Sequence, residues 1–368
     1  MGSERSARCG IIGIISGLLS LLLLCSSNLR ASAIKADETV VFLSGIGNQQ
    51  SDGWNLDIHG WVYESEYHKP ITSLFRRALG IRDDELTREE QATFRERAQF
   101  FLVDNERHKT VSIRLGEMTF ALASSLPNGH FQTNLHILFE DVDRFGLASL
   151  LTNRAAQFQM VPPKKSIQPV NGVVELLPAT GISVISDIDD TIKVSDVRDH
   201  KELLLNTFCR PYQAVPGMAQ QYRTWEKSDG ARFHYVSATP WQLYLPLSEF
   251  IRANGFPEGT FQLKLFRWKD QTFFDLFKSP EHFKLGAIRP LFERFPQRKF
   301  VLLGDSGEKD PEIYAALARE FPNQVSHIFI RDTTGQAQDS RRYRATFSGL
   351  STNRWQIFRQ PSELPAGL

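Results

Sequence analysis

The chain has 368 residues, of which 41% are hydrophobic and 23% charged, an ordinary globular composition with length enough for two domains. Its 43 basic and 42 acidic residues give a net charge of +1, which does not indicate a nucleic-acid-binding protein. Two of the three cysteines lie within the first 25 residues, and the third is Cys209. Without those first residues no internal disulfide can form, so the fold must rest on its core.

The first 33 residues have the layout of a secretory signal peptide. Two arginines precede an apolar run over residues 11–25, and Ala31 and Ala33 supply the small residues typical of a cleavage site. The apolar run is short for a membrane-spanning helix, which makes an uncleaved anchor the weaker alternative. The sequence therefore predicts export, to the periplasm or out of the cell, with a mature chain that begins at or near Ile34.

Residues 37–165 are rich in predicted strands. Apolar and polar residues alternate, as in strands with one buried and one solvated face, over residues 56–62, 111–115 and 131–137. Between the first two of these segments, apolar residues over 71–79 fall at helical spacing, and Thr87 and Glu90 have the spacing of a capping box at the start of a second helix. The pattern predicts a small β-sandwich-like accessory domain with a helical insertion.

Prolines and lysines over residues 161–166 predict a solvated domain boundary. Beyond it, continuous apolar runs at 182–185, 233–236, 300–303 and 325–330 alternate with helical patterns at 243–252, 283–295 and 312–321. Continuous apolar strands suit a parallel sheet that is covered on both faces. We therefore predict an α/β domain with a doubly wound parallel sheet over residues 170–335, with ligands bound at the carboxyl ends of its strands, and a C-terminal extension over 336–368.

The first predicted strand of this domain runs into Asp187, Asp189 and Thr191, which form a D-x-D-x-T string. Phosphoryl transfer through a covalent intermediate needs a carboxylate nucleophile and a second group that protonates the leaving oxygen and then deprotonates water. We interpret Asp187 as the nucleophile and Asp189 as the acid/base. The alternative is that the two acids only cap a turn, but paired carboxylates are costly to hold together after a buried strand.

The ends of the other predicted strands supply further groups that this chemistry needs. Ser237 follows the second strand and Lys284 opens a helix, and both are candidates to bind phosphoryl oxygens. Magnesium prefers hard oxygen ligands and neutralises the repulsion between carboxylate and phosphate. Its candidate ligands are Asp187, Asp189, Asp305 and Asp310.

Two of these assignments have alternatives. Lys278 competes with Lys284 as the phosphate-binding lysine, although Lys284 stands at the start of the amphipathic helical pattern. Asp310 precedes Pro311, so it could be a helix N-cap, a metal ligand or both.

Other conspicuous residues have structural interpretations. His234 lies within an apolar strand and is expected to be a core histidine with satisfied hydrogen bonds, and Cys209 is expected to be buried. The arginine-rich residues 341–344 suggest a solvated surface turn. The aromatic side chains at Phe266, Trp268, Phe273, Phe274 and Phe277 are expected to pack in the core or to form an apolar rim for a lipid chain.

The motifs together resemble those of the haloacid-dehalogenase superfamily. In order, they are residues 187–191, Ser237, Lys284 and residues 304–310. Their flanks are similar to the catalytic domain of the actin-patch-type phosphatidate phosphatases: S-D-I-D-D-T-I-K at 186–193, Y-V-S-A-T-P-W at 235–241 and G-D-S-G-E-K-D-P-E-I-Y at 304–314. The resemblance covers roughly residues 180–335. It implies magnesium-dependent hydrolysis of phosphatidate to diacylglycerol, through a phosphoenzyme on Asp187.

The motifs specify a phosphomonoester and not the group attached to it. The resemblance favours phosphatidate or a related lipid phosphate, with transient contact between the enzyme and a membrane surface. The alternatives are a phosphatase of soluble phosphomonoesters and a non-catalytic binding module that keeps the same fold. Net charge near zero gives no attraction to anionic lipids, so contact with a membrane would have to be apolar.

Overall fold

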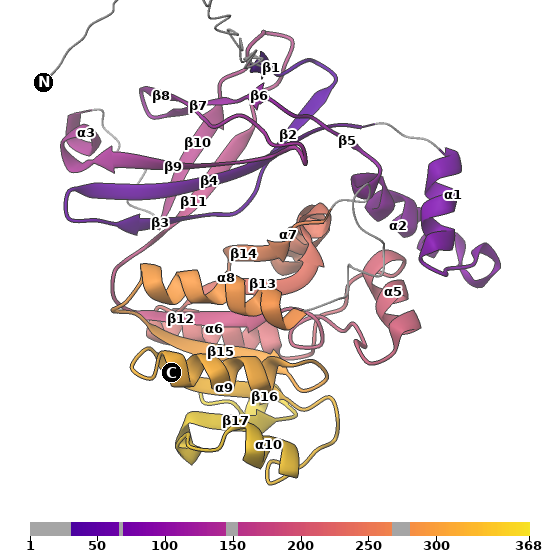
Figure 1. Ribbon diagram of the computed structural model, residues 1–368, viewed down its shortest axis with the longest axis vertical. Helices are drawn as coiled ribbons and strands as arrows, with labels where there is room; N and C mark the ends of the chain where they lie inside the picture. Colours follow the sequence, from indigo (N-terminus) through magenta and orange to yellow (C-terminus); the bar gives the residue numbers. More distant parts are fainter. Residues whose placement is uncertain (1–30, 66–68, 145–153, 267–279) are drawn as a thin grey trace, which may run out of the picture. The chain divides into compact units, whose positions relative to one another are not determined.

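The computed structural model describes residues 31–65, 69–144, 154–266 and 280–368. These residues form two large sheets, one of nine strands from the N-terminal part and one of six strands from the C-terminal part (Figure 1). The short strands β1 and β6 form a separate parallel pair. The predicted combination of an α/β domain with a parallel sheet and a strand-rich N-terminal region is confirmed at this level.

The nine-stranded sheet is built around β4, which pairs with β2, β3, β5 and β9. Its pairing with β9 runs from Gly53 opposite Leu138 to Trp61 opposite His130. The alternating residues of the predicted strands place Leu56 and Phe131 in the core of this sheet. The strands of the region are β1 Ser32–Ala33, β2 Glu38–Phe42, β3 Gly45–Gln49, β4 Gly53–Glu64, β5 Asp104–Asn105, β6 Lys109–Thr110, β7 Ser112–Leu115, β8 Met118–Ala121, β9 His130–Leu138, β10 Ala155–Met160 and β11 Asn171–Leu177.

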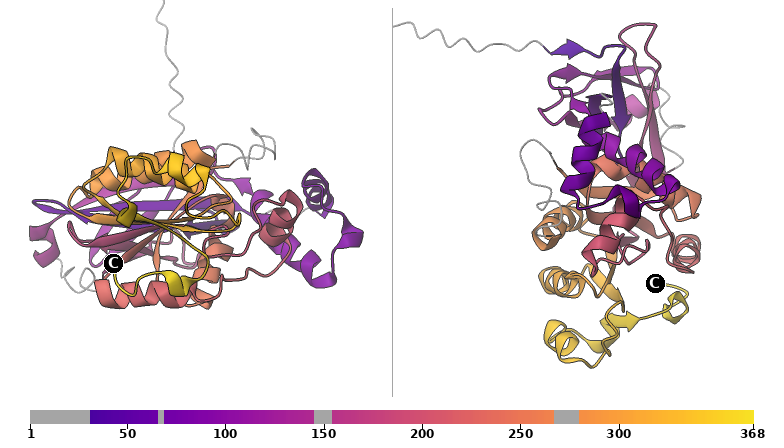
Figure 2. Two further views of the ribbon diagram at one scale, coloured as in Figure 1. Left: turned by 90° about the horizontal axis from the view of Figure 1, so that it is seen from below. Right: turned by 90° about the vertical axis from the view of Figure 1, so that its right-hand side faces the viewer.

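The predicted helical insertion is α1 (Lys69–Ala78) and α2 (Arg88–Ala98), with a third short helix, α3 (Phe139–Arg144), after β9. The predicted capping box is confirmed, because the Thr87 side chain accepts from the Glu90 amide and the Glu90 carboxylate accepts from the Thr87 amide. Phe75 and Phe94 of the insertion pack against Phe208 of α5 (His200–Phe208), a helix of the C-terminal part. Figure 2 shows the ribbons of α1 and α2, in purple, beside that of α5, in pink.

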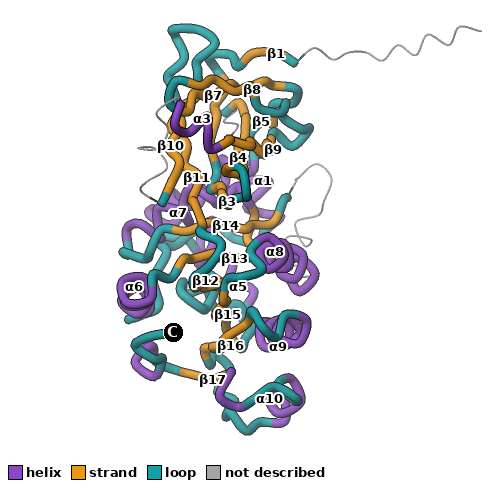
Figure 3. The backbone as a smooth tube through the Cα atoms, turned by 90° about the vertical axis from the view of Figure 1, so that its left-hand side faces the viewer, coloured by secondary structure: helices purple, strands orange, loops and turns teal. Residues whose placement is uncertain are grey.

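The six strands of the second sheet are all parallel, in the order β14-β13-β12-β15-β16-β17. Helices α6 and α7 cover one face, and α8, α9 and α10 cover the other (Figure 3). The strands are β12 Ile182–Asp187, β13 Arg232–Pro240, β14 Gly259–Lys264, β15 Lys299–Asp305, β16 Val325–Arg331 and β17 Trp355–Phe358. The helices are α6 Met218–Asp229, α7 Tyr244–Ala253, α8 Pro280–Arg294, α9 Asp310–Glu320 and α10 Arg341–Thr346.

Two of the predicted domain boundaries fall next to strands that pair across them. Residues 161–166 form the connection between β10 and β11, and β11 pairs antiparallel with β10 and parallel with β3. Prolines and lysines suit a solvated hairpin connection as well as a linker, so the sequence signal was ambiguous. Residues 336–368 add α10 and the sixth strand, β17, to the parallel sheet, with Tyr343 and Phe358 buried. The chain passes from the nine-stranded sheet to the parallel sheet between the end of β11 at Leu177 and the start of β12 at Ile182.

Several smaller expectations are confirmed. His234 is fully buried, and its ring lies 2.7 Å from the Thr260 hydroxyl and 3.0 Å from the Ser183 hydroxyl. Burial, with nearby arginines, lowers the pKa of His234 to about 3, so the ring is neutral. Cys209 is a buried free thiol.

Candidate active site

The candidate site lies where three neighbouring parallel strands end. Asp187 is the last residue of β12 and Asp305 the last residue of β15, the strand beside it. Ser237 lies toward the end of β13 on the other side of β12. Because adjacent parallel strands end at the same edge of the sheet, residues far apart in sequence meet there.

Lys284 brings a positive charge to this edge from α8. Within the described residues this helix covers Pro280–Arg294, so Lys284 lies inside it. Its buried ammonium lies 2.8 Å from Asp187 Oδ1, 2.9 Å from Glu308 Oε2 and 2.5 Å from Asp310 Oδ1. Burial works against the charge, but these carboxylates outweigh it and raise the pKa of Lys284 well above its usual value. The competing candidate, Lys278, lies outside the described residues.

Three carboxylates crowd together here, and two of them, Asp187 and Asp310, contact Lys284. Asp187, Asp305 and Asp310 each offer an oxygen atom within 4.8 Å of the others, and all three side chains are buried. Burial and the neighbouring acidic groups raise the pKa of Asp187 and of Asp305 well above the usual range, although Lys284 opposes the effect. The crowding therefore leaves the site short of positive charge.

The two carboxylate oxygens of Asp305 differ in their hydrogen bonding. Asp305 Oδ1 accepts from the amide of Gly307 at 2.6 Å, whereas the buried Oδ2 has no hydrogen-bond partner. A buried carboxylate oxygen without a partner costs free energy unless a cation satisfies it. The donor set of three carboxylates fits a divalent cation with a preference for oxygen ligands.

Asp310 is turned into this cluster and is not the N-cap of its helix. Lys309 holds the N-cap position, and Asp310 is the first residue of α9. Asp310 Oδ2 accepts from the Asp305 amide at 3.2 Å, and its Oδ1 contacts Lys284. A Cβ atom at Gly304 would lie 2.3 Å from Asp310 Oδ2, so the absence of a side chain at Gly304 makes room for this carboxylate.

The carboxylate of Asp189 belongs to a different set of contacts and is not one of the three clustered carboxylates. Its Oδ1 lies 2.8 Å from Lys193 Nζ and accepts from the Ser195 hydroxyl at 2.7 Å. Its Oδ2 accepts from the hydroxyls of Ser237 and Thr239, at 2.9 and 3.1 Å. Burial opposes ionisation, but Lys193 and the hydroxyl donors lower the pKa of Asp189 to about 2. The structure thus separates Asp189 from the other three predicted metal ligands.

The loop between the two aspartates is held by its own side chains. Thr191 donates its hydroxyl hydrogen to Asp187 Oδ2 at 2.8 Å, which places it against the predicted nucleophile. Asp190 has a positive φ of 55°. Its carboxylate accepts from the amides of Ser195, Asp196 and Val197 at 2.7 to 2.8 Å, and so fixes the chain that follows.

Sequence reasoning did not single out three residues that contact the predicted site. Lys193 and Ser195 bind Asp189, and Glu308 binds Lys284. Lys193 and Glu308 lie inside the motif flanks, so their position was a signal. A lysine is so seldom buried, however, that sequence alone gives no reason to assign it to a site.

The arginine-rich segment also differs from its predicted role as a solvated turn. It forms α10, where Tyr343 is buried. The Arg342 guanidinium donates to the carbonyls of Ser306 and Glu308, at 2.5 and 2.8 Å, and pairs with Glu312 at 2.9 Å. Arg342 therefore supports the loop after β15 that carries Glu308.

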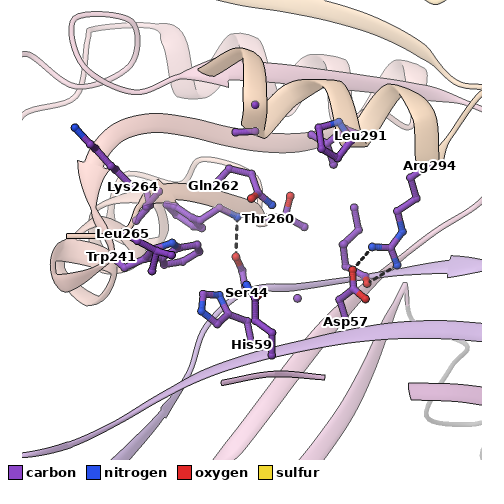
Figure 4. Close-up of a pocket in the computed structure, with 18 of the residues that line it drawn as sticks. Ser44, Asp57, His59, Trp241, Thr260, Gln262, Lys264, Leu265, Leu291 and Arg294 are labelled. Atoms are coloured by element: carbon purple, nitrogen blue, oxygen red, sulfur yellow. Dashed lines mark hydrogen bonds and ion pairs between the residues drawn. The ribbon is translucent and has the colours of Figure 1, made fainter. Parts of the chain in front are cut away.

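A groove of about 800 Å³ lies beside the candidate site, between the edge of β14, the helix α8 and the nine-stranded sheet. Figure 4 shows Trp241, Lys264 and Leu265 toward one end and Asp57 with Arg294 toward the other. The ion pair between Asp57 and Arg294 ties the last residue of α8 to β4. The groove shares α8 and the segment after β13 with the candidate site, but none of the clustered carboxylates lines it.

Comparison with known proteins confirms the resemblance predicted from the motifs. Residues 182–332 match the family model described as phosphatidate phosphatase APP1, catalytic domain. Phosphatidate phosphatase APP1 of Saccharomyces cerevisiae is 29% identical over 334 residues, which cover 87% of this chain and 52% of the yeast protein. An uncharacterized protein of Schizosaccharomyces pombe is 34% identical over 183 residues, or 48% of this chain and 29% of that protein.

The chain thus spans about half the length of the first relative and less of the second. The family match covers β12 to β16 and includes every predicted site residue from Asp187 to Asp310.

Proposed function

Because residues 182–332 match the catalytic domain of phosphatidate phosphatase APP1, we propose that this chain is a haloacid-dehalogenase-like phosphatase. The observation that carries the proposal is the crowding of Asp187, Asp305 and Asp310, two of which contact Lys284, with one buried oxygen of Asp305 unpaired. A site with surplus negative charge at the ends of parallel strands suits a cation together with a phosphate group, and a structural ion pair would not need the third carboxylate.

The same carboxylates support magnesium as the cofactor. Asp187, Asp305 and Asp310 would hold it, since all three offer hard oxygen atoms. When bound, magnesium supplies the positive charge that lets a carboxylate approach a phosphate dianion. Asp189 is a weaker candidate ligand than it was in the sequence prediction, since both its oxygens already have donors.

In the proposed reaction, a carboxylate oxygen of Asp187 attacks phosphorus, and the bond from phosphorus to the leaving oxygen breaks. Asp189 gives a proton to the leaving oxygen. It then takes a proton from the water that hydrolyses the aspartyl phosphate. Thr191 fixes the orientation of Asp187, and Lys284 and Ser237 are placed to offer donors to phosphoryl oxygens.

In the absence of substrate, the protonation state of Asp189 suits its proposed role as the base that accepts a proton from water. With a pKa of about 2 the carboxylate is ionised at neutral pH and can accept a proton from water. To act first as an acid it must acquire a proton when substrate is bound. The negative charge of a phosphate group beside Asp189 raises the pKa of this carboxyl group in that complex.

We propose phosphatidate or a related lipid phosphate as the substrate, on the strength of the family match and the printed name of the yeast relative. The predicted aromatic rim gives no support to a lipid substrate. Phe266 is buried against Phe101, and the other aromatic residues of the segment, up to Phe277, lie outside the described residues. A phosphatase of soluble phosphomonoesters remains the second candidate, because the site residues specify a phosphomonoester and not the group attached to it.

The test is turnover of phosphatidate in mixed micelles and of glycerol 3-phosphate, each with magnesium and with excess chelator. We expect phosphate release from phosphatidate that depends on magnesium. Release from glycerol 3-phosphate alone would remove the lipid assignment and keep the phosphatase. No magnesium-dependent release from either substrate would contradict the phosphatase and favour the binding module.

Export remains part of the proposal. The predicted signal peptide lies almost wholly in residues 1–30, outside the described residues, and described structure begins at Ala31. Mass spectrometry of the protein from a secreting host should give a mature chain that begins at or near Ile34. An intact N-terminus in a membrane fraction would instead support an uncleaved anchor.

A further inference from the structure

Lys193 is a buried lysine that no motif of the proposed mechanism uses. It lies in the loop after β12, and only 1% of its surface is exposed. Its ammonium contacts Asp189 Oδ1 at 2.8 Å and the Ser195 hydroxyl. The same ammonium lies 5.0 Å from the centre of the Tyr212 ring, and Arg97 of α2 lies 3.7 Å from that centre. Lys193 is therefore enclosed by an aromatic ring and by one carboxylate.

The backbone holds this lysine in place. The Lys193 amide donates to the Ile188 carbonyl at 3.0 Å, and its carbonyl accepts from the Asp190 amide at 2.7 Å. A bridge also pairs Lys193 with Ala214. These hydrogen bonds fix the position of the Lys193 backbone beside Asp189.

The contacts of Asp189 are complete on both oxygens. Oδ1 has the ammonium of Lys193 and the hydroxyl of Ser195, and Oδ2 has the hydroxyls of Ser237 and Thr239. Donors on both oxygens from two separate segments fix the plane of the carboxylate as well as its position. Proton transfer depends on such alignment, because the acid must point at the oxygen that leaves.

We infer that Lys193, supported by Ser195, is a positioning residue for Asp189 in proton transfer to the leaving oxygen. The inference rests on the proposed phosphatase function. A buried lysine–carboxylate pair adds little stability compared with apolar residues of the same volume. In this site the pair serves to orient Asp189. Lys193 holds Oδ1, so the hydroxyl groups that bind Oδ2 can be replaced by groups of the substrate.

This role has a consequence that a purely structural role lacks. An alkyl alcohol leaves phosphorus poorly unless it is protonated, whereas 4-nitrophenolate leaves without help. The value of kcat/KM reports the steps up to formation of the phosphoenzyme, which include departure of the leaving group. Misplacing Asp189 should therefore lower kcat/KM for an alkyl phosphate far more than for an aryl phosphate.

The experiment compares wild type, Lys193→Met, Asp189→Asn and the double variant on two substrates with magnesium. One is 4-nitrophenyl phosphate, and the other is the alkyl phosphate that wild type cleaves fastest among phosphatidate, lysophosphatidate and glycerol 3-phosphate. We expect Lys193→Met to lower kcat/KM about 10- to 100-fold on the alkyl phosphate and less than about threefold on the aryl phosphate. The double variant should be no worse than Asp189→Asn, because both changes disable one function.

Lys201→Met is the matched control. Lys201 lies on α5, eight residues further along, with an exposed side chain that pairs with Glu85. It should leave both substrates unchanged. Equal losses on the two substrates in Lys193→Met would overturn the positioning role and leave a structural one. A wild type that cleaves neither substrate would overturn the proposed phosphatase as well, so the two failures are distinguishable.

Ser195→Ala keeps the inference testable if Lys193→Met does not fold. It removes the other donor to Asp189 Oδ1 without leaving an unpaired charge. We expect the same preference in the loss, at about 3- to 10-fold on the alkyl phosphate, with the aryl phosphate unchanged. An unaltered ratio of the two kcat/KM values in Ser195→Ala would contradict the role of Oδ1 alignment.

Discussion

The two sheets handle buried charge in opposite ways. Glu38 of β2, in the nine-stranded sheet, is paired with Lys109 of the neighbouring strand pair: Lys109 Nζ lies 2.5 Å from Glu38 Oε1 and 3.1 Å from Glu106 Oε2, and the Lys35 amide donates to Glu38 Oε2 at 2.9 Å. At the edge of the parallel sheet, three carboxylates converge on Lys284, and Asp305 Oδ2 has no partner at all.

The pKa shifts follow this difference. Burial opposes the charge of Glu38, but Lys109 outweighs it and lowers the pKa of Glu38, so the pair is stable by itself. Burial and neighbouring carboxylates raise the pKa of Asp187 and Asp305. The first cluster is complete, and the second lacks positive charge. Local conflict of this kind in an otherwise consistent fold is expected at functional sites, which is why the second cluster carries the proposed chemistry.

The strongest test of the comparison is Asp187→Asn. The amide keeps the shape and the contact with Thr191 but cannot attack phosphorus, so the phosphatase rate should fall by at least about a thousandfold. Because the change removes one of the crowded carboxylates, the melting temperature in chelator should stay equal or rise. Substantial turnover by the folded variant would contradict the proposed nucleophile.

Glu38→Gln should lower stability and leave the phosphatase rate unchanged, the opposite of Asp187→Asn. It leaves Lys109 buried with weaker compensation, so the free energy of unfolding at pH 7 should fall by roughly 2–4 kcal/mol. Since the pKa of Glu38 is lowered, its contribution is present above about pH 4.5 and is lost as the pH falls below it. The rate per folded molecule should be unchanged.

Denaturant titrations at pH 7 and below pH 4 would measure this effect. Glu117→Gln, at an exposed turn of the same sheet, is the control. A loss of phosphatase rate in folded Glu38→Gln would mean that the paired cluster also serves the reaction.

Asp305→Asn tests the acidic cluster at the edge of the parallel sheet. It removes the carboxylate with the unpaired oxygen, so the metal-free protein should be no less stable than wild type. The magnesium concentration for half-maximal rate should rise roughly 10- to 100-fold, because a candidate ligand has lost its charge. Magnesium titrations of rate and of melting temperature would check both effects together. An unchanged magnesium requirement would exclude Asp305 as a ligand.

Much of this contrast could be predicted from sequence, because strand ends are easy to recognise. Apolar runs that end in Asp187 and Asp305 predicted β12 and β15, and parallel topology then brought these residues together. The partners could not be predicted in the same way. Lys193 meets Asp189 through a loop whose course depends on a positive φ at Asp190 and on three amides bound by that side chain.

The ends of the parallel sheet were harder to predict for a different reason. The strand β17 has four residues, only Phe358 of which is buried, so its alternation is too short to detect. The strand β11 follows the predicted boundary and yet pairs with β10 and β3, because proline and lysine mark exposed connections of every kind. This strand carries Glu175, which pairs with Arg232 at the start of β13.

Glu175 is the residue that could break the comparison, because it resembles the clustered carboxylates Asp187 and Asp305 while lying in the nine-stranded sheet. Its Oε1 lies 3.2 Å from Arg232 Nη1, and its buried Oε2 has no partner. Burial raises the pKa of Glu175 to about 7, and Arg232 and Arg298 only partly oppose this. A raised pKa means that the folded state favours the protonated acid. The contribution of Glu175 to stability is therefore complete below pH 4.5 and is lost as the pH rises through about 7.

Replacing Glu175 by glutamine should remove this pH dependence and leave the shape of the side chain. We expect the free energy of unfolding of wild type, measured in magnesium, to fall by roughly 1–2 kcal/mol relative to Glu175→Gln between pH 5 and pH 8. Glu117→Gln, at an exposed turn of the same sheet, should follow the wild-type curve. The phosphatase rate should not change, because Glu175 lies at the opposite ends of the strands from Asp187 and would be unpaired without being functional. Parallel curves for wild type and Glu175→Gln would show that Arg232 satisfies the carboxylate. A changed rate would mean that an unpaired carboxylate marks function in both sheets.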